Sequence, residues 1–293
     1  MKPPVFDYYD PETLDEALDL MDRYGPEAKV LAGGQSLVPL LNLRLARPAA
    51  LVDLNRIPGM DGIHLEDGWI RIGAMARQWD AEHAPEVVRH LPILAEALRF
   101  VGHLQIRMRG TVGGSIAHAD PAAELPALLL CLEGEVVARR RDGMRVIPAK
   151  ELFVTYLTTS LEPDEILTEV RWPIPPPGTG WAFVELARRH GDYALVGVAV
   201  LVRLNADGSV AEARIAFTGC GPVPVRAEEA ERALRGARPS GQLWEEAAQV
   251  AACSLEPPSD LHASGAARKH LAAVLTARAL MKAAERANPG GKR

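Results

Sequence analysis

The order of hydrophobic and polar residues predicts a mixture of helices and strands at the start of the chain. Residues 13–23 place apolar side chains at helical spacing, and Thr13 with Glu16 forms the capping box that begins a helix. Short apolar runs at 28–32 and 51–54 predict two buried strands. The first part of the fold is therefore expected to combine both kinds of element.

The next segments are predicted mainly from their turns. Asp-Gly dipeptides that separate two apolar runs indicate hairpins, and apolar residues at every third or fourth position indicate helices. The expected elements are a helix at 35–45, hairpins at 63–72 and 136–147, and helices at 92–101 and 124–132, with a glycine-rich turn at 110–114.

A proline-rich segment divides the chain. Four of the five residues at 173–177 are proline, and two glycines follow closely, so we predict a linker here. Three strands and then three helices are expected beyond it, which is an α+β layout. The strands are expected at 181–186, 194–204 and 210–217, and the helices at 227–235, 243–254 and 262–286.

The composition excludes several classes of protein. Of the 293 residues, 48% are hydrophobic and 24% are charged, as in an ordinary globular protein. The formal net charge of −5 offers no basic field to attract nucleic acid. No apolar stretch is long enough for a membrane span, and the N-terminus lacks the pattern of an export signal. We therefore expect a cytoplasmic protein.

The cysteines indicate neither a disulfide framework nor a cluster. Cys131, Cys220 and Cys253 lie far apart and form no Cys-x-x-Cys pair, and their number is odd. We expect them to be buried thiols that pack as small hydrophobic side chains. An iron–sulfur cluster needs more thiolates than this chain offers, so any cluster belongs to another polypeptide.

Two glycine pairs carry the strongest chemical signal. One lies in the segment 30–37 and the other in the segment 110–121, and a hydroxyl side chain accompanies each pair. Paired glycines allow positive φ and let a ligand approach the backbone, so that successive N–H groups bind an anion such as a diphosphate. Neither segment brings a lysine or an arginine, which excludes a P-loop. On spacing alone, the alternative that both are merely turns stays open.

The amino-acid sequences of these segments resemble those of a known family. Ala32-Gly33-Gly34-Gln35-Ser36-Leu37, Thr111-Val112-Gly113-Gly114-Ser115 and the run from Ala119 to Ala127 are similar to the FAD-binding subunits of molybdenum hydroxylases. Within the family, the chain resembles the carbon monoxide dehydrogenase medium subunits more than the flavin domain of xanthine dehydrogenase, which is more distant. The resemblance extends nearly end to end.

The resemblance implies a fold and a division into domains. It implies an FAD-binding fold of the vanillyl-alcohol oxidase type, with subdomains at 1–57 and 58–177. A C-terminal α+β domain at 178–290, with a three-stranded antiparallel sheet and helices, would follow. The flavin would lie between the two subdomains and the C-terminal domain.

The resemblance also implies the residues that bind FAD. The first glycine segment would wrap the diphosphate, the second would act as another clamp, and four further residues would contribute from elsewhere. The set is Val30, Leu31, Ala32, Gly33, Gly34, Gln35, Ser36, Leu37, Thr111, Val112, Gly113, Gly114, Ser115, Asp120, Glu124, Leu167 and Tyr193.

Some of these residues have equally ordinary interpretations. Glu124 also suits the first turn of a helix, where the macrodipole favours an acid. Tyr193 offers a flat surface to a flavin but packs equally well in a strand core. From the residues alone, Leu167 is better explained as core than as a ligand. Ser115 and His118 depart from the residues that relatives often carry, and His118 with Asp120 offers too few ligands for a metal.

The implied function is electron transfer within a larger complex. In the family, a molybdenum-cofactor large subunit oxidises the substrate, and an iron–sulfur small subunit passes electrons to the flavin. The flavin then reduces NAD, oxygen or a quinone, and the complex is expected to be a dimer of heterotrimers. The alternatives are a stand-alone FAD oxidase, a scaffold without cofactor, and an NAD site at 219–224, where Pro224 replaces the third glycine of the dinucleotide motif.

Overall fold

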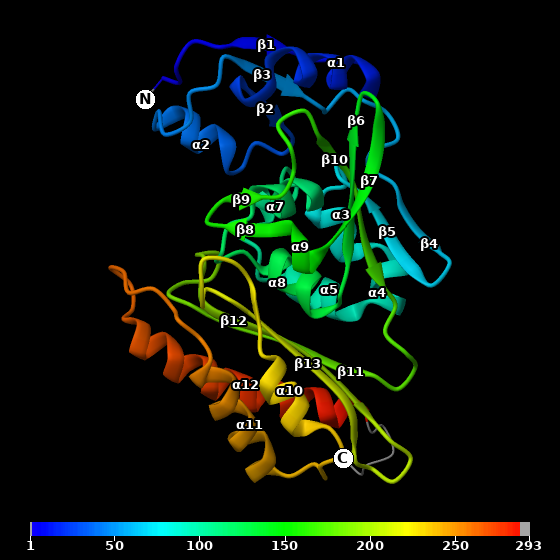
Figure 1. Ribbon diagram of the computed structural model, residues 1–293, viewed down its shortest axis with the longest axis vertical. Coiled ribbons are helices and arrows are strands. Elements are labelled where there is room, and N and C mark those ends of the chain that lie inside the picture. The colour runs from blue at the N-terminus through cyan, green and yellow to red at the C-terminus, as the bar shows by residue number, and fades with distance from the viewer. Residues whose placement is uncertain (1, 288–293) are drawn as a thin grey trace.

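The computed structural model describes residues 2–287 and places three sheets one after another along the long axis of the molecule (Figure 1). The first sheet contains the N-terminal strands, the second contains five strands from the middle of the chain, and the third contains the C-terminal strands. No helix among the described residues is both long and apolar enough to cross a membrane.

The first sheet is parallel and three-stranded. Its order is β1 (Asp7–Tyr9), β3 (Ala50–Asp53) and β2 (Ala28–Leu31). Helix α1 (Leu14–Tyr24) follows β1 and begins with the predicted capping box: the Glu16 amide donates to the Thr13 hydroxyl, and the Thr13 amide donates to the Glu16 carboxylate. Helix α2 (Leu37–Asn42) confirms the predicted helix but is shorter than 35–45.

The second sheet has the order β4-β5-β10-β6-β7 and is antiparallel where its register is given. Both predicted hairpins are present. The sequence did not predict the central strand β10, which returns from far along the chain to pair with β5 and β6. The strands are β4 (Ile63–Glu66), β5 (Trp69–Gly73), β6 (Glu135–Arg140), β7 (Gly143–Pro148) and β10 (Ile166–Pro173).

Short helices accompany this sheet and enclose the larger hydrophobic core. Both helices predicted here, α5 and α8, are confirmed within a few residues of their predicted bounds. The elements are α3 (Gln78–His83), α4 (Pro85–His90), α5 (Pro92–Leu98), α6 (Leu104–Arg107), α7 (Val112–His118), α8 (Glu124–Cys131) and α9 (Ala149–Leu152), with the small hairpin β8 (Phe153–Thr155) and β9 (Thr158–Thr159).

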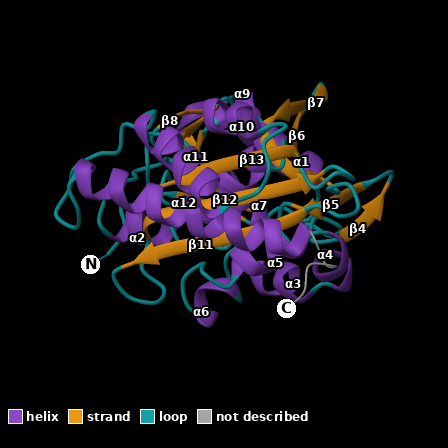
Figure 2. Cartoon of the chain, turned by 90° about the horizontal axis from the view of Figure 1, so that it is seen from below, coloured by secondary structure: helices purple, strands orange, loops and turns teal. Residues whose placement is uncertain are grey.

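The third sheet is antiparallel and has its own core against three helices. Figure 2 shows α11 and α12 lying along the strands of this sheet. The predicted three strands are present, and the short β14 adds a fourth. The elements are β11 (Gly180–Ala187), β12 (Ala194–Leu204), β13 (Val210–Thr218), β14 (Val225–Arg226), α10 (Glu228–Leu234), α11 (Gly241–Cys253) and α12 (Gly265–Ala287).

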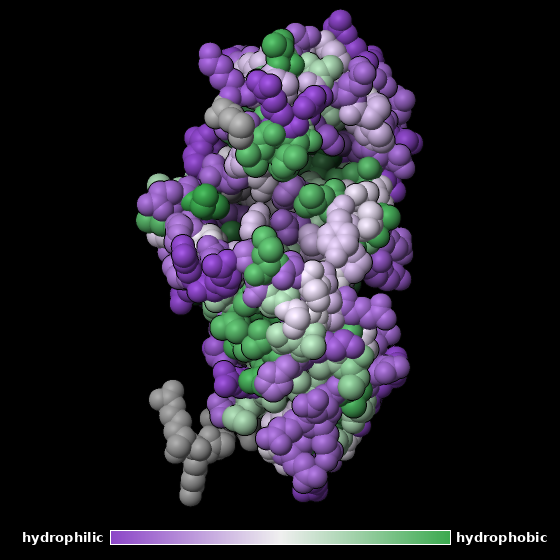
Figure 3. Space-filling model, turned by 90° about the vertical axis from the view of Figure 1, so that its left-hand side faces the viewer, coloured by the Kyte–Doolittle hydropathy of each residue, from purple (hydrophilic) through white to green (hydrophobic). Residues whose placement is uncertain are grey.

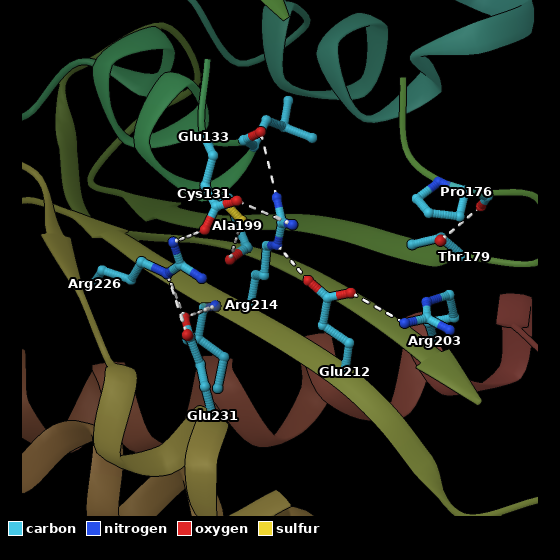
Figure 4. A network of polar contacts seen from close by, with 12 residues as sticks. Cys131, Glu133, Pro176, Thr179, Ala199, Arg203, Glu212, Arg214, Arg226 and Glu231 are labelled. Atoms are coloured by element: carbon cyan, nitrogen blue, oxygen red, sulfur yellow. Dashed lines mark hydrogen bonds and ion pairs between the residues drawn. The ribbon is translucent and has the colours of Figure 1, made fainter. Parts of the chain in front are cut away.

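Ion pairs and a cavity mark the junction between the second and third sheets. Glu133, directly after α8, binds Arg214 on β13 and Arg226 on β14 (Figure 4). A cavity of about 350 Å³ lies beside these groups and is bordered by the proline linker. Neither glycine segment contributes to its lining, so this cavity is not the site that the sequence predicts.

The cysteines match their prediction in part. Cys131 and Cys220 are buried, as expected for small hydrophobic side chains, and neither is in a disulfide. Cys253 is exposed, so the prediction was wrong for this residue. It is the last residue of α11, where a helix turn ends at the surface rather than in the core.

Candidate functional site

The first glycine pair forms the loop that leads from β2 into α2. Gly34 has a φ of +73°, a conformation that a side chain would strain. Gly33 is glycine for a different reason: a Cβ there would lie 2.4 Å from the Arg109 carbonyl oxygen and 2.7 Å from the Gly110 Cα. Gly33 therefore lets two distant backbone segments touch, and Gly34 lets the chain turn.

The backbone of this loop offers a run of free donors. Among residues 2–287, no acceptor takes a hydrogen bond from the amides of residues 32–37, whereas the amide of Val38 returns to the Gly34 carbonyl as α2 begins. Buried or partly buried backbone N–H groups are almost always paired in a folded protein. An unpaired run beside a positive-φ glycine is the arrangement that binds phosphate groups. The loop therefore fits the diphosphate of a dinucleotide.

The second glycine pair is not a turn, which corrects the prediction for 110–114. Gly113 and Gly114 lie in the first turn of α7, and Thr111 is the N-cap. The Gly114 amide donates to the Thr111 hydroxyl at 3.0 Å, and the amides of Val112 and Gly113 donate to carbonyls of the 74–76 segment. These amides are therefore occupied by the protein, so the donors for an anion come from the first segment.

The two glycine segments nevertheless lie against each other. A Cβ on Gly114 would come 3.6 Å from the Ala32 Cβ, and Gly33 packs on the residues just before Thr111. Thr111, Val112 and Gly113 are buried, while Gly114 and Ser115 are partly accessible. Within residues 111–115, then, Gly114 and Ser115 are the residues that remain accessible to a ligand.

Tyr193 lies close to both predicted regions. It follows β11 in the connection to β12, and the residue is 59% exposed. Partial burial and the nearby Asp120 carboxylate raise the pKa of Tyr193, while the neighbouring Ser36 hydroxyl opposes the rise. Tyr193, which belongs to the C-terminal sheet region, thus lies near Ser36 of the first glycine loop and presents an exposed aromatic surface.

Two carboxyl groups near these residues are removed from water, Glu124 fully and Glu185 in part. Glu124 begins α8 and is 5% exposed, and burial raises its pKa to about 7. Burial also raises the pKa of Glu185 on β11 to about 9, with a contribution from the Glu124 charge. The Glu185 Oε2 atom is buried without a hydrogen-bond partner among the described residues. The desolvation of both carboxyl groups therefore favours their protonated forms.

Leu167 is a buried residue of the second sheet. It is in β10, 6% exposed, and belongs to the large hydrophobic core. This burial agrees with the interpretation of Leu167 as a core residue that its sequence context favours.

Sequence reasoning missed three residues of this region: Asn55, Arg77 and Glu185. Asn55 directly follows the predicted strand 51–54, but nothing in the sequence marked it as a contact of the first loop. Arg77 and Glu185 lie in segments without any motif. One face of the molecule is hollowed between its upper and middle parts, and hydrophobic side chains gather there (Figure 3).

The chain matches known proteins over nearly its whole length. The family model for the FAD binding domain in molybdopterin dehydrogenase matches residues 4–175, and the model for the CO dehydrogenase flavoprotein C-terminal domain matches residues 181–283. The 6-hydroxypseudooxynicotine dehydrogenase complex subunit alpha of Paenarthrobacter nicotinovorans is 45% identical over 99% of this chain and 98% of its own length. The carbon monoxide dehydrogenase medium chain of Hydrogenophaga pseudoflava is 39% identical over 96% of this chain and 97% of its own length.

Solved structures agree with these relatives. Carbon monoxide dehydrogenase from Hydrogenophaga pseudoflava matches with a TM-score of 0.95 and 40% identity, covering 98% of this chain and 99% of that chain. Quinoline 2-oxidoreductase from Pseudomonas putida 86 matches with a TM-score of 0.94 and 38% identity, with the same coverage. The chain therefore belongs to the family of FAD-binding subunits of molybdenum hydroxylases.

Proposed function

We propose that the unpaired amides of residues 32–37 hold the FAD diphosphate, and this run of free donors is the observation that carries the proposal. The partly accessible Gly114 and Ser115 close the other side of the loop. The complete set proposed to line the cofactor site is Val30, Leu31, Ala32, Gly33, Gly34, Gln35, Ser36, Leu37, Thr111, Val112, Gly113, Gly114, Ser115, Asp120, Glu124, Leu167 and Tyr193.

Two side chains have distinct roles in this proposal. Burial raises the pKa of Glu124 and favours its protonated form, and a protonated carboxyl group both donates and accepts hydrogen bonds, which suits sugar or ribityl hydroxyls. Tyr193 presents its ring as a flat surface for the flavin. The bound flavin supplies the redox chemistry, and the chain supplies binding, orientation and electrostatics.

The chain is proposed to transfer electrons rather than to select the substrate. The names of three relatives refer to carbon monoxide, nicotine and caffeine. Each of these relatives is 37–40% identical to this chain over at least 96% of this chain's length. Substrate choice is therefore assigned to another polypeptide. We propose that an iron–sulfur small subunit donates the electrons, that a molybdenum-cofactor large subunit oxidises the substrate, and that NAD, oxygen or a quinone accepts the electrons.

The assembly and the domain limits are proposed together. The complex would be a dimer of heterotrimers in the cytoplasm. This chain would contribute FAD-binding subdomains at 1–57 and 58–177 and a C-terminal domain at 178–290, of which residues 288–290 lie outside the described residues.

Matched glycine variants test where the diphosphate binds. Gly34→Ala strains a positive-φ residue inside the loop, and Gly208→Ala strains a residue with a φ of +82° in a hairpin of the third sheet. We expect the full chain to bind FAD and the Gly34 variant to lose most of that affinity, because the strained residue would reorient the backbone amides of residues 32–37. The Gly208 variant should bind FAD normally. Equal affinity in both variants would place the diphosphate elsewhere.

A further inference from the structure

The glycine segments contain no cationic side chain, but the fold brings one to the place where they meet. We propose that Arg77, together with Asn55, is a positioning pair that holds the two glycine segments at the spacing that FAD requires. This inference rests on the proposed position of the FAD diphosphate. It adds two residues that no sequence motif marks.

Arg77 reaches both sides of the junction. Its Nη1 donates to the Arg109 carbonyl at 2.8 Å, and its Nη2 donates to the Asn55 Oδ1 at 2.6 Å. Its backbone forms an isolated antiparallel bridge with Thr111. Arg77 is therefore attached to the second glycine segment through its main chain and extends its side chain towards the first.

Asn55 completes the connection to the first segment. Its Nδ2 donates to the Ala32 carbonyl at 2.9 Å, immediately before Gly33. The Asp53 carboxylate accepts hydrogen bonds from the Asn55 amide and side chain, and it also accepts the Tyr8 hydroxyl at 2.6 Å. These bonds fix the direction of the Asn55 side chain. The contacts thus link the Ala32 carbonyl, through Asn55 and Arg77, to the Arg109 carbonyl.

The Arg109 carbonyl is also the group against which Gly33 packs. Because a Cβ on Gly33 would come within 2.4 Å of this oxygen, the two segments are as close as their backbones allow. A small shift of Arg109 would move Gly33 and with it the free amides that follow. Hydrogen bonds that fix the position of this carbonyl therefore also fix the position of the proposed diphosphate loop.

The charge of Arg77 is not neutralised by a direct partner. Among residues 2–287, no carboxylate forms an ion pair with it, and both of its acceptors are neutral oxygens. Burial and the neighbouring Arg109 lower its pKa, and Asp80, Asp53 and Asp61 act in the opposite direction from farther away. A guanidinium left with neutral acceptors stabilises a nearby anion, which suits a position behind the diphosphate.

The test compares FAD binding with folding in the full chain. Arg77→Met removes the charge and both hydrogen bonds, Arg77→Lys keeps the charge but not the forked geometry, and Asn55→Ala breaks the connection on the other side. Arg56→Met is the matched control, because Arg56 is adjacent to Asn55 but pairs with exposed carboxylates of the 10–12 segment. FAD affinity is measured by flavin fluorescence, and folding by thermal unfolding of the FAD-free chain.

We expect Arg77→Met and Asn55→Ala each to weaken FAD binding by about tenfold to a hundredfold, as for the loss of hydrogen bonds to a charged group. The double variant should bind FAD about as weakly as either single variant, because both break the same connection. Arg77→Lys should be intermediate, and Arg56→Met should bind normally.

Other results would overturn the inference. An Arg77→Met chain that binds FAD within about twofold of the wild type would show that the pair does not position the site. If the loss of FAD affinity in the double variant equalled the product of the losses in the two single variants, Arg77 and Asn55 would not act through one connection. A wild-type chain that fails to bind FAD would instead overturn the proposed function, and the two failures are therefore distinguishable.

Discussion

Glu185 makes the stability of the FAD-free chain depend on pH in a direction opposite to that of most acidic residues. Its carboxyl group is largely buried on β11, near Glu124, and burial raises its pKa to about 9. The unfolded chain releases this proton near the ordinary glutamate pKa of about 4.5. Between these two values the folded state binds more protons than the unfolded state, so stability falls as the pH rises.

The magnitude follows from the width of this interval. Each pKa unit corresponds to about 1.4 kcal/mol, so a shift from about 4.5 to about 9 gives an upper bound of roughly 6 kcal/mol. Glu185 is partly accessible, and water and side-chain movement reduce the penalty. We therefore expect about 2–3 kcal/mol of the unfolding free energy to be lost between pH 5 and pH 9.

The substitution Glu185→Gln removes the titration while keeping the shape of the side chain. We expect the variant to match the wild type near pH 5 and to be more stable by about 2–3 kcal/mol at pH 9. Urea unfolding of the FAD-free chain at pH values from 5 to 9 measures this difference. Glu124→Gln should act in the same direction, with a stability gain that builds up between about pH 4.5 and pH 7 and remains above pH 7, because burial raises the Glu124 pKa from 4.5 to about 7.

Glu165 provides a control of opposite sign. Burial raises the pKa of Glu165, but hydrogen bonds from Arg145 and the Glu162 amide, together with the charges of Arg145 and Arg140, lower it overall. Its contribution to stability is present at neutral pH and is lost as the pH falls below the ordinary glutamate value, so Glu165→Gln should destabilise the chain at neutral and high pH. If the unfolding free energies of Glu185→Gln and wild type ran parallel from pH 5 to pH 9, the buried-carboxyl argument would be refuted.

Three further substitutions test the packing at Gly33, the start of α7 and the junction between the second and third sheets. Gly33→Ala should cost about 1–3 kcal/mol in urea unfolding, because its Cβ would meet backbone atoms that are unable to move aside, whereas Gly143→Ala, with nothing within 4 Å, should be neutral. Thr111→Val should cost about 0.5–2 kcal/mol by removing the cap of α7, and Thr111→Ser should restore the thermal midpoint; a neutral Thr111→Val would contradict the capping role. Glu133→Gln should cost no more than about 1 kcal/mol by thermal unfolding, since this carboxylate is about half exposed, and a larger loss would show that the ion pairs hold the third sheet in place.

Local signals predicted much of this fold. The capping box at Thr13, the Asp-Gly hairpins and the proline-rich linker each depend on residues within a few positions of one another, and each is present in the structure. Asp67 and Gly68 both have positive φ, as the two-residue hairpin turn between β4 and β5 requires. The two glycine segments were identified in the same way, and the resemblance of their letters led to the correct family.

Features that depend on contacts between distant residues were not predicted from the sequence. Strand β10 is central only because β5 and β6 lie on either side of it, and its alternating charged residues pair with neighbours across the sheet. The second glycine pair was interpreted as a turn, whereas tertiary packing gives Gly113 no room for a Cβ beside Ala74 and places the pair in a helix. Short-range periodicity contains no information about such neighbours.

The sequence by itself determined the local elements, the two glycine segments and the family. Only the tertiary structure decided that free amides occur in the first glycine segment, while those at the start of the second are occupied by neighbouring carbonyls and a hydroxyl. It also decided that Arg77 and Asn55 join the segments and that Glu185 lies near Glu124. The physical reason is that hydrogen-bond satisfaction and desolvation depend on which distant atoms surround a group, and chain folding alone brings those atoms together.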